Sequence, residues 1–121
     1  MVFVFERGGG VNKAYRIKKS TEIDALLKQK NRIANGYFSL FFGMNPAMDH
    51  YRFALSVPKK FGNAVERNRI KRQIREIVRL SPITEAVDLF LIVKTKTNEL
   101  GYAQLREQMM ILFARAKIIK G

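Results

Sequence analysis

The sequence predicts a single α+β domain, and three observations lead to this fold class. The chain has 121 residues, of which 47% are apolar, enough for one core and too many for a disordered chain. Two segments alternate apolar and polar residues as strands do, and a third is almost continuously apolar. Three further segments repeat apolar residues at helical spacing, and one of them lies between two predicted strands. A strand, a helix and a strand in succession favour a βαβ unit, so we expect a mixed sheet with helices packed on it.

The first twelve residues differ from the rest of the chain. Three consecutive glycines at residues 8–10 are typical of a flexible linker. Three interpretations stay open: a frayed terminus, a short edge strand, or a non-native extension with the natural start at Val11. The third interpretation has two reasons. A GTG start codon is translated as valine when it lies inside a longer reading frame. A purine-rich ribosome-binding site, if translated by mistake, would encode Glu-Arg-Gly-Gly. We divide the chain into a flexible or non-native extension (1–12), one domain (13–117) and a loose tail (118–121).

A short helix is predicted over residues 21–30, after a basic lead-in at residues 12–19. Ser20 is placed to cap this helix, and Glu22 lies in the first turn, where the helix dipole favours an acid. The apolar residues at helical spacing are Ile23, Leu26 and Leu27. Basic residues lie near the end of this helix. They either stabilise the negative end of the helix dipole or contact phosphate. These basic residues are Lys28, Lys30 and Arg32.

Two strands are predicted at residues 37–44 and 52–57, joined by a turn at 45–50. We expect them to pair as an antiparallel hairpin. Alternation places Phe38, Leu40, Phe42 and Met44 on one face of the first strand. Tyr37 and Phe41 fall on the other face. They either offer rings for bases to stack on or form core beneath a helix, and we favour the core.

A strongly basic helix is predicted over residues 63–80. Between Lys59 and Arg79 there are eight Lys or Arg and two acids, a balance that favours a polyanionic partner. Asn63 and Glu66 have the spacing of a capping box, and Pro82 makes continuation unfavourable. At about 100° per residue, an apolar stripe adjoins a basic arc that we expect to face outward. The stripe is Ile70, Ile74, Ile77 and Val78; the arc is Lys71, Arg72, Arg75 and Arg79 with Asn68; Arg67 projects close to the stripe.

The last two elements are a buried strand and an amphipathic helix. Residues 87–93 are nearly all apolar, which is typical of a central strand covered on both faces. We expect Asn98 to cap the final helix. Its core-facing residues are predicted to be Tyr102, Leu105, Met109 and Leu112, with Phe113 beside them.

The composition narrows the possible functions. Cysteine is absent, which excludes disulfides and cysteine-ligated metal sites, and no apolar run is long enough to span a bilayer. The net charge of +13 favours nucleic acid as partner, with a membrane surface second. His50 is the only histidine, and we find no catalytic or metal-binding motif. We interpret the chain as a small, basic, cytoplasmic α+β domain that binds nucleic acid without nuclease chemistry of its own.

Residues 53–76, with the triplet Arg67-Asn68-Arg69 at their centre, closely resemble the signature of the bacterial ribonuclease P protein subunit. The resemblance continues more weakly from Tyr15 to about Phe113. It implies a ribosomal-protein-like α+β fold in the order αβββαβα, with a left-handed βαβ crossover that general handedness rules disfavour. Two strands are predicted before the basic helix, and the third is expected from splitting or extending them. Residues 32–35 resemble the family's approach to its first strand.

The resemblance also implies a function. The family's holoenzyme removes the 5′ leader of precursor tRNA by phosphodiester hydrolysis, and its RNA subunit is the catalyst, with Mg²⁺ bound mainly by that RNA. The protein would then hold no catalytic residue and no metal. Its partners would be ribonuclease P RNA and precursor tRNA, with no membrane and no small-molecule substrate.

Site residues carry over from the family by position. Expected at the RNA subunit are Lys59, Lys60, Asn63, Arg67, Asn68, Arg69, Lys71, Arg72 and Arg75. Expected at the leader, between the first helix and the sheet, are Arg16, Lys18, Ile23, Leu27, Asn35, Phe38 and Phe41. This chain departs from the family pattern, which usually has Phe at positions 23 and 27 and often Tyr at position 41. Because aliphatic side chains cannot stack as rings do, we expect weaker or differently placed leader contacts.

Two other classes of function compete with this one. A ribosomal or general RNA-binding protein fits the charge equally well but not the ordered motif. A membrane-surface or calmodulin-type helix would fit a basic amphipathic segment. The chain lacks tryptophan, however, and a sheet to pack on explains the apolar stripe better.

Overall fold

The computed structural model describes residues 16–17, 20–28, 31–83 and 86–119. Its helices and strands follow the order αβββαβα that the family resemblance implies. The elements are α1 (Ser20–Lys28), β1 (Arg32–Ala34), β2 (Phe38–Met44), β3 (Arg52–Ser56), the 3-10 helix η2 (Lys59–Phe61), α2 (Ala64–Leu80), β4 (Val87–Val93), the 3-10 helix η3 (Thr95–Glu99) and α3 (Tyr102–Arg115). The α+β fold class is confirmed.

The four strands form one mixed sheet in the order β1-β2-β4-β3. β4 is antiparallel to β2 and parallel to β3, so β3, α2 and β4 form the predicted βαβ unit. Five of the seven β4 residues are buried, as expected for a strand covered on both faces. The left-handed sense of the crossover stays a prediction.

The predicted hairpin between residues 37–44 and 52–57 is wrong. β4 lies between β2 and β3, and pairs with β2 from Phe38↔Val93 to Met44↔Val87. The partner of β2 on its other side is β1, through Arg32↔Phe41 to Ala34↔Ser39. Alternation specifies which face of a strand is buried but not which strand lies beside it. β4 is the most apolar strand, and it takes an inner position because both of its faces must be buried away from water.

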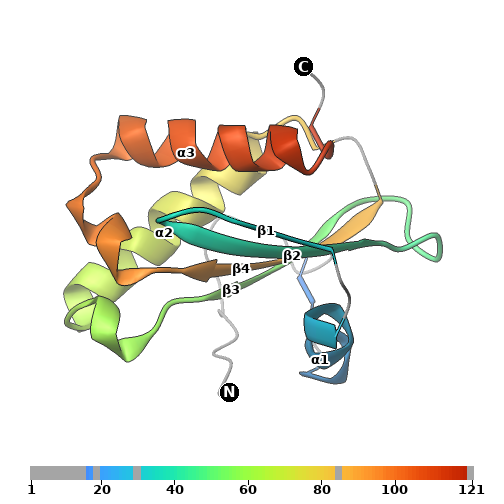
Figure 1. Ribbon diagram of the computed structural model, residues 1–121, viewed down its shortest axis with the longest axis horizontal. Helices are drawn as coiled ribbons and strands as arrows, with labels where there is room; N and C mark the ends of the chain where they lie inside the picture. The colour runs from blue at the N-terminus through green and yellow to red at the C-terminus, as the bar shows by residue number, and fades with distance from the viewer. Residues whose placement is uncertain (1–15, 18–19, 29–30, 84–85, 120–121) are drawn as a thin grey trace.

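The sheet separates two apolar layers (Figure 1). α2 and α3 cover one face, and α1 lies against the other. Phe38 and Leu40 of β2 enter the larger core beneath α2 and α3, whereas Phe41 packs against the smaller core beneath α1. The alternation of β2 is therefore confirmed. Tyr37 is an exception, because it precedes β2 and packs on the larger core instead of sharing a face with Phe41.

Several element ends differ from the predictions. Ser20, predicted as the cap before the first helix, is instead the first residue of α1. The predicted end of this helix at residues 29–30 lies outside the described residues. α3 begins at Tyr102, since Asn98 is held in η3. Ile118 is buried in the larger core, and Ile119 bridges Ile83. The expectation of a loose tail is wrong for these two residues, because the core needs their side chains.

Candidate nucleic-acid interface

The start of α2 is fixed by the predicted capping box. Asn63 Oδ1 accepts a hydrogen bond from the Glu66 N–H at 2.9 Å, and Glu66 Oε1 accepts one from the Asn63 N–H at 3.1 Å. The second oxygen of Glu66 accepts from Asn98 Nδ2 of η3, also at 3.1 Å. These donors, Asn98 first, lower the pKa of the Glu66 carboxyl below its usual value. The acid is therefore ionised at neutral pH and joins two elements at this end of the molecule.

The apolar stripe of α2 lies in the larger core, as predicted. Ile70, Ile74, Ile77 and Val78 are all buried there. Six of the nine residues expected at the RNA subunit are exposed around the helix start and its outward side: Lys59, Lys60, Asn63, Asn68, Arg69 and Arg72. Four of these are cations, Lys59 and Lys60 on η2 and Arg69 and Arg72 on α2. The core fixes the orientation of α2 and so the direction in which Arg69 and Arg72 point.

The other three motif cations lie beside the core and not on the outward side. Arg67 and Lys71 are half-buried, and Arg75 is only 9% exposed. The prediction that Arg75 faces outward is wrong. At about 100° per residue, these three follow one another along one border of the apolar stripe, so their alkyl stems cover its edge. Arg67 Nε is buried, and within the described part of the chain no hydrogen-bond acceptor meets it.

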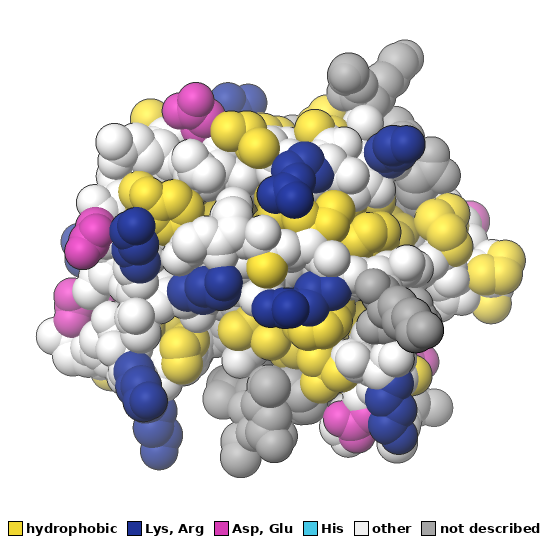
Figure 2. Space-filling model, viewed as in Figure 1, with side chains coloured by type: hydrophobic (Ala, Val, Ile, Leu, Met, Phe, Trp, Pro, Cys, Tyr) yellow, Lys and Arg dark blue, Asp and Glu magenta, His cyan; other side chains and the backbone are white. Residues whose placement is uncertain are grey.

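Basic side chains are also spread over the face where β1 and β2 are foremost (Figure 2). Lys and Arg lie across the middle of this face with hydrophobic side chains between them, while acidic side chains lie toward its margins. Cationic surface is thus not confined to α2. Such a surface attracts a phosphate backbone over more than one side of the molecule.

The α1 face of the sheet holds part of the expected leader-binding set. Phe41 and Leu27 are half-buried and pack on the same small core. Arg16 forms an isolated bridge with Phe53, which places it beside the β3 edge of the sheet. Lys18 lies outside the described residues. The prediction that Phe41 is core beneath a helix is right in part, because the residue packs on this core but is only half-buried.

Three residues of the leader-binding set have structural roles, and for Asn35, which is half-buried, the leader contact stays a prediction. Ile23 and Phe38 are both 0% exposed, and Phe38 lies on the opposite face of the sheet from α1. Neither side chain reaches the surface, so we withdraw both as leader contacts. Asn35 Oδ1 accepts hydrogen bonds from the N–H groups of Tyr37 and Phe38, each at 2.8 Å, and so forms the β1–β2 turn.

Arg32 is a surface residue of this face that the sequence did not assign to it. It lies opposite Phe41 in the β1–β2 register, and its guanidinium is 5.7 Å from the Phe41 ring centre. Its Nη2 also donates to Ser39 Oγ at 3.3 Å. β1 is only three residues long, too short for alternation to reveal it, so Arg32 reads as the end of the preceding helix. The apolar–small pair Ile33-Ala34 that directly follows it is the one signal available.

An ion-pair network holds α1 on the sheet. Arg52 Nη1 of β3 lies 3.1 Å from Glu22 Oε2 of α1, and its Nη2 lies 2.8 Å from Asp88 Oδ2 of β4. Asn45 Nδ2 donates to the same Asp88 oxygen at 3.1 Å. The hydrogen bond to Asp88 is the main reason that the pKa of Arg52 is raised. The network fixes the distance between α1 and the strands that flank the expected leader site.

The described residues lack two kinds of feature. No helix in these ranges is long and apolar enough to cross a membrane. Across the same ranges, no group of three or more His, Cys, Asp or Glu side chains is placed to hold a metal ion.

Fold and surface together define a class: a small basic α+β protein that displays a capped cationic helix above a mixed sheet. Comparison with known proteins narrows the class. The family model described as Ribonuclease P matches residues 11–117. The chain therefore belongs to the ribonuclease P protein family, whose members are protein components of a tRNA-processing endoribonuclease holoenzyme.

Individual relatives agree with this assignment. The chain is 36% identical over 112 residues to the ribonuclease P protein component of Acholeplasma laidlawii, covering 91% of this chain and 96% of that protein. It matches the structure of the Staphylococcus aureus RNase P protein with a TM-score of 0.81 at 36% identity, covering 89% of this chain and all of that one. The Thermotoga maritima RNase P protein matches with a TM-score of 0.75 at 29% identity, covering 88% and 98%.

Proposed function

We propose that this chain binds the RNA subunit of ribonuclease P through α2 and the 5′ leader of precursor tRNA through the α1 face. In doing so it assists removal of the leader in the cytoplasm. The observation that carries the proposal is the two-sided build of α2: its apolar stripe is buried, while Asn68, Arg69 and Arg72 are exposed. Guanidinium groups match phosphate oxygens in pairs, so a fixed row of them recognises a folded RNA backbone.

The chemistry is assigned to the RNA subunit. Mg²⁺ is a hard cation that prefers phosphate oxygens and water, so we place it mainly on the RNA. The protein's cations then offset phosphate repulsion between the RNA subunit and the precursor. We expect this to lower the Mg²⁺ concentration that cleavage requires.

The leader contact rests on fewer side chains than the family pattern has. Phe41 offers one half-exposed ring, and Arg32 lies above it. A base stacked on such a ring contributes about 1–3 kcal/mol, whereas Leu27 offers only apolar contact. We therefore assign the leader site to Arg16, Leu27, Arg32 and Phe41, with Lys18 kept as a prediction.

Reconstitution tests the proposal. The full chain is added to ribonuclease P RNA and precursor tRNA at low Mg²⁺, and 5′ processing is measured. We expect stimulation by the wild-type chain and a sharp loss with Arg67→Ala/Arg69→Ala. The matched control is Arg106→Ala/Arg115→Ala, which removes two exposed arginines from α3. Full cleavage with the Arg67/Arg69 variant would contradict the proposal, as would no stimulation by the wild type.

A further inference from the structure

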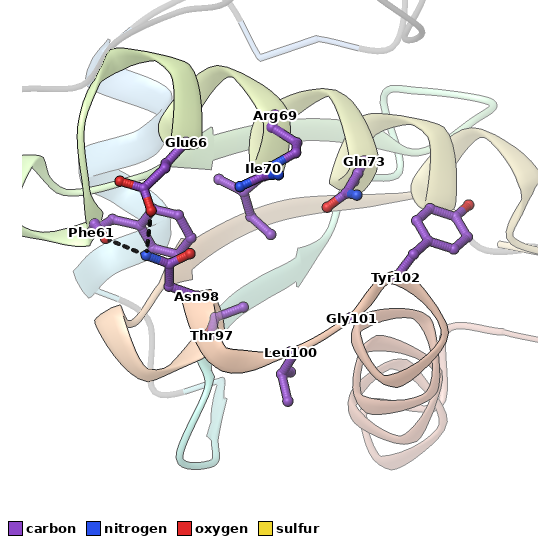
Figure 3. Close-up of a pocket in the computed structure, with 10 residues that line it drawn as sticks. All are labelled: Phe61, Glu66, Arg69, Ile70, Gln73, Thr97, Asn98, Leu100, Gly101 and Tyr102. Atoms are coloured by element: carbon purple, nitrogen blue, oxygen red, sulfur yellow. Dashed lines mark hydrogen bonds between the residues drawn. The ribbon is translucent and has the colours of Figure 1, made fainter.

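A pocket of about 300 Å³ lies between α2 and the segment that joins β4 to α3 (Figure 3). Arg69, Ile70 and Gln73 of α2 face Asn98 of η3 and Tyr102 of α3 across it. The remaining lining residues are Phe61, Glu66, Thr97, Leu100 and Gly101. This volume is at the lower end of the range for small-ligand pockets, about 300–1,000 Å³, which suits one planar ring system.

Polar groups without partners meet in this pocket. Among the described residues, the Arg69 guanidinium, the Gln73 amide and the Tyr102 hydroxyl make no hydrogen bond. Asn98 Nδ2 donates both to the Phe61 carbonyl and to Glu66 Oε2, each at 3.1 Å. Because its amide nitrogen is occupied, Asn98 presents its carbonyl oxygen as an acceptor. The pocket therefore offers donors and acceptors together with apolar walls.

The charges in the pocket distinguish a base from a phosphate. Glu66 is an ionised carboxylate in the lining, which disfavours a second anion inside. Arg69, by contrast, is exposed, and Lys59 and Lys60 are exposed on η2, which packs beside η3. The surroundings thus attract a phosphate backbone while the interior favours a neutral group that can form hydrogen bonds. An unpaired nucleobase attached to a bound backbone meets both conditions.

We propose that this pocket receives one unpaired adenine of the bound RNA subunit. Tyr102, 38% exposed, stacks on the ring. The Gln73 amide donates to adenine N1 and accepts from its N6 amino group, a pairing open to single-stranded RNA bases. Arg69 contacts the phosphate next to that base. This inference rests on the proposed function, since the RNA must first dock on α2.

The test compares two pocket variants with matched controls in the full-length chain bound to ribonuclease P RNA. Gln73→Ala is paired with Gln108→Ala, another half-buried glutamine on a helix. Tyr102→Ala is paired with Ile111→Ala, an exposed apolar residue of α3 outside the pocket. Dimethyl sulfate probing of adenine N1 reports on the base, and binding titrations report on affinity.

We expect the wild type and both controls to protect one unpaired adenine that becomes reactive with Gln73→Ala and with Tyr102→Ala. Tyr102→Ala should weaken binding at least about fivefold, the lower limit for losing one stacked base. Identical reactivity with all four variants, or loss of affinity without a change at any adenine, would overturn the inference. Failure of the proposed function appears differently, as no stimulation of cleavage by the wild-type protein.

Discussion

Arg52 of β3 donates two parallel hydrogen bonds to Asp88 of β4, from Nε to Oδ1 at 2.9 Å and from Nη2 to Oδ2 at 2.8 Å. Both side chains are largely buried, and the third nitrogen of the guanidinium meets Glu22 of α1. The Arg52 side chain therefore joins the edge strand β3 to the inner strand β4 and to the helix α1. The position of α1 depends on this arginine as well as on apolar packing.

Arg52→Met should destabilise the fold by about 3 kcal/mol. The reason is that the Asp88 carboxylate stays in place without its main donor. Urea unfolding measures the change. Arg106→Met on α3 serves as the control, because Arg106 is exposed and a surface change of this kind costs about 0.5 kcal/mol or less. Equal stability of the two variants would show that the network contributes nothing net.

Phe38→Ala and Phe41→Ala should have different effects, although the two residues are three positions apart. Phe38 is fully buried, so its truncation should cost about 3–5 kcal/mol of stability. Phe41 is only half-buried, so its truncation should cost less stability. It should also reduce the preference for precursor tRNA over tRNA without a leader. Unfolding and binding measurements on both variants check this, and indistinguishable results would argue against the assignment of the two faces.

Gly62→Ala should destabilise α2 at its start. A Cβ at position 62 would lie 2.6 Å from Glu66 Oε1 and 3.0 Å from Glu66 Cδ, so the carboxylate would have to move. The Glu66 half of the capping box is therefore weakened, while the Asn63 half stays in place. Gly36→Ala is the matched control, since no atom lies within 4 Å of the added Cβ. Thermal unfolding of both variants measures the difference, and a neutral Gly62→Ala would contradict the prediction.

The stability contributed by Glu66 should be lost in acid. Its pKa is lower in the folded chain than its ordinary value of 4.5, because Asn98 and the Asn63 N–H donate to the charged form. A lowered carboxyl pKa gives stability that is fully present above the ordinary value and disappears as the pH falls through the folded value. Glu66→Gln should therefore be less stable than the wild type at pH 7, and the two should converge as the pH falls through the folded value. Parallel stability curves for the two chains across this window would count against it.

Arg72→Ala should reduce the salt dependence of RNA binding. Arg72 is exposed on the outward side of α2, so we expect it to neutralise one phosphate. Removing it should make the negative slope of log K against log salt shallower by about 0.7–0.9. Arg106→Ala on α3 carries the same charge change and should leave the slope unaltered. Binding titrations over a range of salt concentrations give both slopes, and equal slopes would place the RNA away from this side of α2.

The sequence predicted the local features of this fold well. The capping box of α2 depends on residues three positions apart, and its apolar stripe on a fixed angle per residue, so both can be read directly. The sheet order could not be read in this way. β2 and β3 looked like a hairpin because they are neighbours in the chain. Whether β3 or the more apolar β4 pairs with β2 depends on the packing of the whole sheet, and not on residues that are close in sequence.

The candidate site was predicted in part for the same reason. Alternation separated Phe38 from Phe41 by face, but only the packing shows which face carries α1. The helical spacing places Arg75 on the outward arc, because it gives the angle of each side chain but not the width of the sheet that the helix covers. The sequence does not reveal the position of Arg32, because a strand of three residues is too short to show alternation.

The inner position of β4 has a consequence for synthesis of the protein. A ribosome delivers β2, β3 and the whole of α2 before the strand that joins them has left the exit tunnel. Until residue 93 emerges, two strands with open edges and an unpacked cationic helix share the nascent chain, and such edges invite pairing with other chains. The sheet must close late, over contacts distant in sequence, which slows folding. A chain that stops before Val87 would keep all the motif cations of α2 and lack the strand that orients them.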